Sequence, residues 1–129
     1  MTDGHSLATV ETYALVALGG FAGANARYAV DGALPALPAT LAVNAVGSAL
    51  LGFLLFEEAY LGVFSGPMRT AVGTGFLSSL TTYSTFAVQT LQATPLYAAG
   101  NVTANYALGI AGVLLGRHVA LALARRADA

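Results

Sequence analysis

Residues Gly73 to Phe86 read GTGFLSSLTTYSTF and lie in the middle of a long apolar segment. The stretch gathers serine and threonine hydroxyls and two aromatic rings where the flanking residues are almost wholly apolar. In a bilayer, each hydroxyl and each backbone group freed from a helix must find a partner without help from water. Such a stretch is therefore expected where a segment at membrane depth lines a cavity or a pore.

The composition of the chain indicates an integral membrane protein. Of the 129 residues, 57% are hydrophobic and only 9% are charged, whereas soluble domains carry about 25% charged residues. A net charge of -1 argues against a nucleic-acid partner, and without cysteine disulfides are excluded. The first twelve residues hold no Lys or Arg, so the first apolar run is interpreted as a retained helix and not as a secretory signal. We expect a multi-pass protein of the cell membrane.

The apolar runs predict an all-α fold in a single domain of residues 1–129, with four transmembrane helices at about residues 12–30, 38–57, 67–94 and 96–118. No charged residue occurs between Thr70 and Gly116, a length that requires two crossings, and Thr94-Pro95 is the natural division between them. An unbroken third helix would be about 42 Å long against a hydrocarbon core of about 30 Å. Tilt or an interruption near Ser78-Ser79 would absorb the excess.

Small residues recur four positions apart in three of the expected helices, and such pairs allow helices to approach closely. Because the chain is rich in glycine and alanine, each pair alone is weak support. A chain of four helices cannot bury the polar groups of its third helix unaided, so we expect an oligomer. The pairs are Gly19 and Gly23, Ser48 and Gly52, and Gly112 and Gly116.

The aromatic residues of the polar stretch are candidate anion ligands. Tyr83 and Phe86 are three residues apart and share one helix face, and Thr82, Ser84 and Thr85 lie beside them. The electron-poor ring edges, together with hydroxyl donors, could solvate a small anion. Alternatively, the hydroxyls bond to the preceding turn and the rings only pack. Taken alone, the stretch favours this second interpretation.

Polar residues in the other helices allow the same two interpretations. The Asn44 amide could receive an anion or, as the more common case, bond across helices, and so could Asn105-Tyr106. Arg27 either extends to the headgroups, which is the default expectation, or draws anions into a vestibule by its field. No Asp, Glu or His lies deep in an expected crossing, which argues against a proton-coupled carrier.

Three motifs in the chain resemble those of the Fluc (CrcB) fluoride channels. GGFAGANARY at 19–28 is similar to the family's GGxxGAxxRY, NAVGSALLG at 44–52 to its NxxGS…G, and GFLSSLTTYSTF at 75–86 to its GFxGGLTTFSTF. The motifs occur in the family's order and together cover nearly all four expected helices. The resemblance implies a passive, fluoride-specific ion channel and not an enzyme, which exports cytoplasmic fluoride and so reduces its toxicity. It also implies an antiparallel, dual-topology-type dimer with two narrow pores, in which the third helix is broken near its middle.

The resemblance assigns roles to individual residues. It implies a fluoride pore lined by polar and aromatic side chains, a vestibule arginine at Arg27, and a structural sodium ion held by the backbone carbonyls of Ser78 and Thr81. Ser78-Ser79 replaces the family's Gly-Gly, so the break must form without the freedom of glycine. Tyr83 replaces its Phe and adds a hydroxyl. The implied pore residues are Asn44, Thr82, Tyr83, Ser84, Thr85, Phe86 and Tyr106.

The arginines are unevenly distributed between the two ends of the expected helices. Four helices place Arg69, Arg117, Arg125 and Arg126 on one side and Arg27 on the other, so the positive-inside rule favours cytoplasmic termini. The partner is therefore either a second copy or, as a hypothesis, an oppositely inserted paralogue. Two other functions stay open on the residues alone: a small four-helix multidrug-type exporter and a structural membrane subunit. The exporter would need a membrane-embedded carboxylate, for which Glu11 is a poor candidate.

Overall fold

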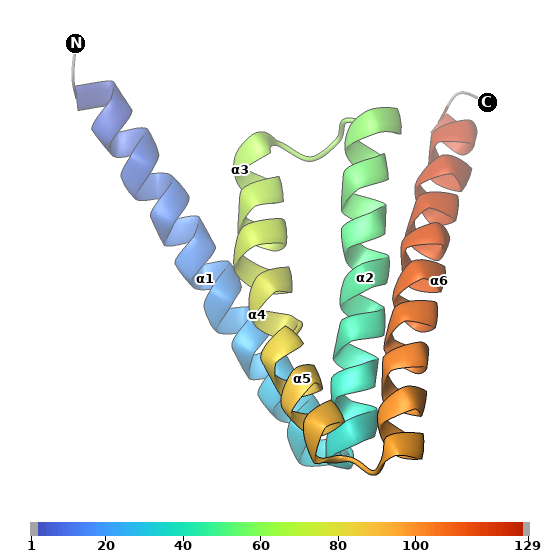
Figure 1. The fold of residues 1–129 in the computed structure, drawn as a ribbon. Coiled ribbons are helices and arrows are strands. Elements are labelled where there is room, and N and C mark those ends of the chain that lie inside the picture. The colour runs from blue at the N-terminus through green and yellow to red at the C-terminus, as the bar shows by residue number, and fades with distance from the viewer. Residues whose placement is uncertain (1–2, 128–129) are drawn as a thin grey trace.

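The computed structural model describes residues 3–127, and these residues fold into helices without any strand. The expectation of an all-α fold is confirmed. The elements, in chain order, are α1 (Asp3–Ala33), α2 (Ala36–Tyr60), α3 (Gly66–Thr70), the π-helical η1 (Ala71–Leu77), α4 (Ser78–Leu80), α5 (Tyr83–Gln92) and α6 (Pro95–Ala127) (Figure 1).

Within the described residues, three helices are long and apolar enough to cross a membrane: Leu7–Ala33, Ala36–Tyr60 and Pro95–Ala127. All three extend beyond the bounds expected from the sequence, because backbone hydrogen bonding continues past the apolar residues that lipid requires. The segment from α3 to α5 is divided into shorter helices. It nevertheless runs from one end of the molecule to the other, with α3 near the upper end in Figure 1 and α5 near the lower end.

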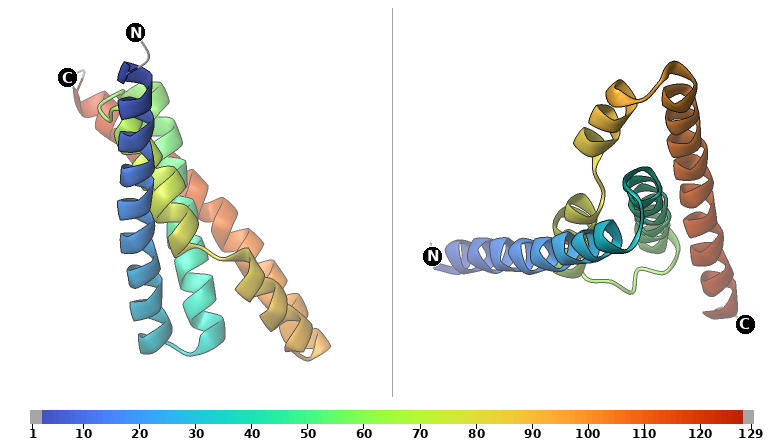
Figure 2. Two further views of the ribbon diagram at one scale, coloured as in Figure 1. Left: turned by 90° about the vertical axis from the view of Figure 1, so that its left-hand side faces the viewer. Right: turned by 90° about the horizontal axis from the view of Figure 1, so that it is seen from below.

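The third segment is interrupted at Thr81-Thr82 and not at Ser78-Ser79, where the sequence suggested the break. Ser78 is helical, with φ -68° and ψ -24°, whereas Thr81 (φ -80°, ψ 160°) and Thr82 (φ -150°, ψ 122°) are extended. Both views in Figure 2 show α5 displaced sideways from α4 beyond this link. Extended backbone is open to every L residue and suits β-branched threonine. Among residues 3–127, only Gly62 has a positive φ, so the break needs no glycine.

Glycines bring α1 into backbone contact with η1, and α2 into backbone contact with α6. A Cβ added to Gly23 would overlap the carbonyl oxygen of Phe76 in η1, and one added to Gly116 would overlap that of Ala49 in α2. A Cβ at Gly112 would lie 2.8 Å from the carbonyl oxygen of Ala45. The predicted small-residue pairs therefore lie at helix contacts, where close approach replaces side-chain packing.

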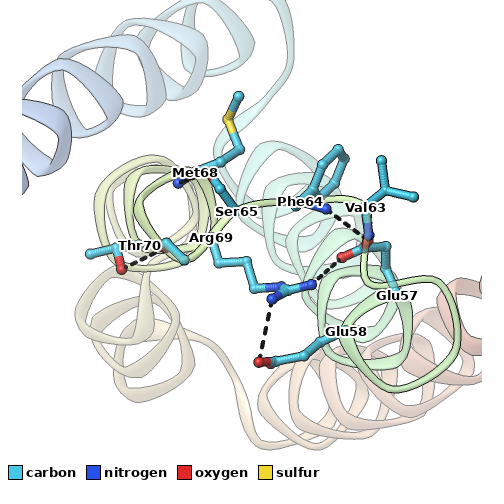
Figure 3. A network of polar contacts seen from close by, with 9 residues as sticks. Glu57, Glu58, Val63, Phe64, Ser65, Met68, Arg69 and Thr70 are labelled. Carbon is cyan, nitrogen blue, oxygen red and sulfur yellow. Dashed lines mark hydrogen bonds and ion pairs between the residues drawn. The ribbon is translucent and has the colours of Figure 1, made fainter.

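The buried carboxylate of Glu57 stabilises the loop between α2 and α3. Glu57 is 1% exposed, accepts hydrogen bonds from the amides of Val63 (2.6 Å) and Phe64 (3.0 Å), and pairs with Arg69 at 3.0 Å. Glu58 approaches the same guanidinium at 3.4 Å from an exposed position. Figure 3 shows both carboxylates directed at Arg69. Because the charge of Glu57 is paired and hydrogen-bonded, its burial is tolerated.

The outer surface of the helices is apolar. The buried cluster is small and centres on Val43, Leu77 and Leu80, whereas large side chains such as Leu91 (85% exposed) and Leu96 (82%) point outward. A soluble protein of this size rarely exposes contiguous apolar surface on this scale. The surface is that of a multi-pass membrane protein, whose apolar side chains face lipid or a second chain.

Candidate functional site

Five polar and aromatic residues from α2, α5 and α6 line a cavity of about 160 Å³, here called the aromatic cavity: Asn44, Tyr83, Phe86, Asn105 and Tyr106. The ring centroids of Tyr83 and Phe86 lie 5.7 Å apart, and those of Phe86 and Tyr106 lie 6.5 Å apart in an edge-to-face arrangement. Phe86 is 8% exposed, whereas Tyr83 and Tyr106 are 75% and 59% exposed. Ring edges and amide groups therefore meet around one small space.

The aromatic cavity exists because α5 begins directly after the break. Thr82 caps this helix: its Oγ1 accepts from the amide of Thr85 (3.2 Å) and donates to Thr85 Oγ1 (3.0 Å), and it lies 3.4 Å from Ser84 Oγ. Such a cap satisfies a helix amide that would otherwise lack a partner. Three of the expected pore residues carry hydroxyls at this point. Thr82 is buried, whereas Ser84 and Thr85 are exposed at the start of α5.

A larger cavity of about 420 Å³ follows the break itself, and we call it the break cavity. It shares Asn44 and Tyr83 with the aromatic cavity, so the two spaces are neighbours. Its remaining wall comes from Gly47, Ser48, Leu51, Gly73, Leu77, Ser78, Thr81 and Thr82.

Two side chains bind the backbone that the break leaves without helical partners. Asn44 Oδ1 accepts from the Thr82 amide (2.9 Å), and Asn44 Nδ2 donates to the Thr82 carbonyl (3.1 Å). Arg27 is half-buried, and its Nη1 lies 3.4 Å from the carbonyl oxygen of Thr81. Its guanidinium thus reaches from α1 to the backbone of the break.

The Ser78 carbonyl is released from the helical pattern. In an α-helix the Thr82 amide would bond to this oxygen, but here it donates to Asn44. The Ser78 hydroxyl instead donates to the carbonyl of Thr74 within its own segment and lies 3.4 Å from that of Gly75, as hydroxyls in membrane helices commonly do. The Ser78 carbonyl thus loses the Thr82 amide as its helical partner, whereas the Ser78 hydroxyl is bonded within its own segment.

Two amides of α6 extend the hydrogen bonds of Asn44: Asn105, for which the sequence left two interpretations open, and Asn101, which it did not single out. Asn105 accepts from Asn44 Nδ2 (3.3 Å), and its own Nδ2 reaches Asn101 Oδ1 (3.0 Å). Asn101 is 9% exposed and donates to Thr90 Oγ1 (2.9 Å). The spacing of four residues between Asn101 and Asn105 was the available signal, since it places two amides on one face of a helix.

The donors around both cavities are neutral apart from Arg27. Among the described residues, no group of three or more His, Cys, Asp or Glu side chains is placed to hold a metal ion. A cation at the break would therefore depend on backbone oxygens, and an anion in the aromatic cavity would depend on amide N–H groups, hydroxyls and ring edges.

The family model described as "CrcB-like protein, Camphor Resistance (CrcB)" matches residues 14–117. The chain is 54% identical over 119 residues to "Fluoride-specific ion channel FluC 1" of Haloarcula marismortui, covering 92% of this chain and 93% of that protein. It is 53% identical over 108 residues to "Fluoride-specific ion channel FluC 2" of Halobacterium salinarum, covering 83% and 84%. It is also 41% identical to "Fluoride-specific ion channel FluC 1" of Methanospirillum hungatei, covering 84% and 77%.

Proposed function

The chain belongs to the family of CrcB-like proteins, and on this premise we propose that it is a fluoride-specific ion channel. It lets fluoride leave the cytoplasm passively through the cell membrane and so reduces the toxicity of the ion, without catalysing a reaction. The observation that carries the proposal is the aromatic cavity, in which ring edges and the amides of Asn44 and Asn105 converge beside the break.

Conduction requires that the protein replace the water around the anion. In this proposal the Asn44 amide and the edges of Phe86, Tyr83 and Tyr106 solvate fluoride in the aromatic cavity. The hydroxyls of Thr82, Ser84 and Thr85 supply further donors along the start of α5. All these donors are uncharged, so they hold the ion weakly enough for it to leave again.

Arg27 is the vestibule residue of this proposal. Its guanidinium is half-buried next to the break, and a cation in such a low-dielectric setting raises the local concentration of anions. The 3.4 Å contact to the Thr81 carbonyl supports this role, because it holds the charge near the two cavities.

A structural sodium ion at the break fits the residues present. The released Ser78 carbonyl and the Thr81 carbonyl, which follows the last turn of α4, would hold it together with the corresponding carbonyls of the partner subunit. Carbonyl oxygens are the ligands that hard cations prefer, and breaks in membrane helices commonly expose them for this purpose. When bound, the ion supplies positive charge that compensates carbonyl dipoles for which the break leaves no backbone N–H partner.

The assembly proposed is an antiparallel dimer of subunits with four transmembrane helices, α3 to α5 forming the third. The exposure of Tyr83 and Tyr106 supports it, since a second chain would complete the walls around these rings. The first described residues of α1 and the last described residues of α6 lie at the same end of the molecule as α3 (Figure 1). Arg69 in α3 and Arg125 and Arg126 in the last turn of α6 therefore share one side. This bias favours an oppositely inserted paralogue as partner over a second copy. If the chain expressed alone forms a conducting homodimer with tags equally accessible from both sides, the paralogue hypothesis is wrong.

A fluoride-selective electrode tests the proposed function. Proteoliposomes loaded with potassium fluoride should release it when valinomycin carries the counter-ion, whereas variants of Asn44 and Phe86 should release it more slowly. A multidrug-type exporter would instead take up organic cations in exchange for protons, and a structural subunit would transport nothing. Fluoride release no faster than from empty liposomes, both by the chain alone and by the chain together with an oppositely inserted paralogue, would contradict the proposal.

A further inference from the structure

The helical hydrogen bonds of α4 end at one backbone amide. The Thr81 amide still donates to the Leu77 carbonyl at 3.0 Å, as the α-helical pattern requires. The next amide, that of Thr82, would donate to the Ser78 carbonyl if the helix continued. It donates instead to Asn44 Oδ1 at 2.9 Å. A side chain of α2 therefore takes the place of the Ser78 carbonyl at the point where the helix ends.

The Asn44 amide group binds both backbone groups of Thr82. Its Oδ1 accepts from the Thr82 amide, and its Nδ2 donates to the Thr82 carbonyl at 3.1 Å. This pair of bonds holds Thr82 in its extended conformation, with φ -150° and ψ 122°. Thr82 is 8% exposed, and buried backbone groups without partners are costly. If Asn44 were removed, closing the helix would return the Thr82 amide to an acceptor, and that acceptor is the Ser78 carbonyl.

The two polar atoms of Asn44 face different groups. A backbone amide can only donate, so Oδ1 is the atom fixed on Thr82. Nδ2 also donates to Asn105 Oδ1 at 3.3 Å, and both asparagines line the aromatic cavity. Asn44 lines the break cavity as well, together with Ser78 and Thr81. The oxygen of this one side chain thus acts on the break, whereas its nitrogen is the donor available to an anion.

We propose that Asn44 is a positioning residue of the cation site: by accepting the Thr82 amide, its Oδ1 keeps the Ser78 carbonyl available to sodium. Without Oδ1, the Ser78 carbonyl is drawn back toward a bond with the Thr82 amide. The cation site exists only while the break is open, so the apparent sodium affinity falls with the fraction of molecules in the open arrangement. The inference rests on the structural sodium ion of the proposed function and is independent of the route that fluoride takes.

Thermal unfolding of the full chain in detergent at increasing sodium chloride tests the inference. N-methyl-D-glucamine chloride replaces sodium chloride at each step, so the ionic strength stays constant. An ion that binds only the folded protein raises its melting temperature according to the ion concentration and the dissociation constant, so the titration gives an apparent dissociation constant for sodium. In Asn44→Ala and Asn44→Leu this constant should rise at least about fivefold, the factor that corresponds to one net hydrogen bond.

Asn44→Asp separates the oxygen of the side chain from its nitrogen. The carboxyl group keeps an acceptor for the Thr82 amide but removes Nδ2 and its two hydrogen bonds. The apparent dissociation constant for sodium should therefore not rise above the wild-type value, while fluoride release should fall, because an N–H donor is lost and the new carboxylate repels anions. If Asn44 only stabilised the fold, the melting temperature would fall equally at every sodium concentration, and the dissociation constant would not change in any variant.

Asn101→Leu is the matched control. It removes an amide that is 9% exposed but leaves both bonds between Asn44 and Thr82, so it should lower the melting temperature without changing the dissociation constant. The inference is wrong if the constant is unchanged in both apolar Asn44 variants, if it rises as much in Asn44→Asp or Asn101→Leu, or if the apolar variants fail to fold even at saturating sodium.

The failure of this inference can be distinguished from the failure of the proposed function. A wild-type assembly whose melting temperature does not respond to sodium would overturn the cation site and the inference together, even if it releases fluoride. A wild-type assembly that responds to sodium but releases no fluoride would overturn the proposed function and leave the role of Asn44 at the cation site to be decided by the variants.

Discussion

Gly47 provides the space into which the Thr81 side chain fits at the break, so Gly47→Ala should destabilise the protein. Gly47 is buried on α2, and an added Cβ would overlap Thr81 Cγ2, with the next atom, Thr81 Cβ, at 3.7 Å. Thr81 cannot turn aside freely, because its Oγ1 donates to the Leu77 carbonyl at 2.9 Å. Losing that bond costs about 1 kcal/mol, and shifting the backbone of the break instead costs roughly 1–3 kcal/mol. The free energy of unfolding should therefore fall by about 1–3 kcal/mol.

A double-mutant cycle isolates this contact. Thr81→Ser removes the clashing methyl group and keeps the hydroxyl, so alone it should cost only about 1 kcal/mol. Combined with Gly47→Ala it should recover stability, with a coupling energy of about 1–2 kcal/mol. Unfolding in mixed detergent micelles, followed by circular dichroism, measures all four proteins. Gly32→Ala is the control, because no atom lies within 4 Å of its added Cβ. If the double variant is no more stable than Gly47→Ala, the break does not pack against α2 as described.

Three further predictions concern the connection, the aromatic cavity and the break. Glu57→Gln should lower the melting temperature in detergent, because two amides and a guanidinium lose a charged acceptor. Glu58→Gln, at an exposed site, should change the melting temperature little. Equal effects of the two substitutions would contradict this prediction. Phe86→Leu should slow fluoride release about tenfold through loss of its aromatic contacts. The release rate of Tyr83→Phe should stay within about twofold of the wild-type rate, because the ring edge remains. A slower release by Tyr83→Phe than by Phe86→Leu would count against the ring-edge mechanism. Purification with N-methyl-D-glucamine in place of sodium should lower the melting temperature of the wild-type assembly, and an unchanged value would indicate that the break carbonyls need no cation.

The helices could be predicted from the sequence because a segment that crosses lipid must be apolar and must also satisfy its backbone hydrogen bonds internally, as a helix does. Their ends could not, since α1 and α6 continue beyond the apolar residues wherever backbone hydrogen bonds remain favourable. The break was expected at Ser78-Ser79 from the polar run and the family's glycines. It lies at Thr81-Thr82 because Asn44, 38 residues away from Thr82 in the chain, takes the amide of Thr82. Local propensity contains no information about such a partner.

The candidate site could also be predicted only in part from the sequence. The spacing of Tyr83 and Phe86 indicated a shared face, and the structure brings both to one cavity with Asn44 and Tyr106. The sequence left open whether Asn44 bonds across helices or faces an anion, and in the structure it bonds across helices at the edge of that cavity. The hydrogen bond from Asn44 to Asn105 and its direction follow only from the three-dimensional structure, because residue spacing cannot give them.

The two rings of the aromatic pair differ in their surroundings, and this difference bears on the assembly. Phe86 is packed from within the chain, with 8% exposure, whereas Tyr83 beside it is 75% exposed. Ring edges solvate an anion better than water only where water is excluded, because electrostatic interactions strengthen as the dielectric falls. One chain therefore supplies half of a dry site at Phe86 and leaves the other half open at Tyr83 and the break cavity. A partner subunit that covers these two features would complete the proposed fluoride path and the proposed cation site together, so a variant that prevents dimerisation should abolish fluoride release even when each monomer stays folded.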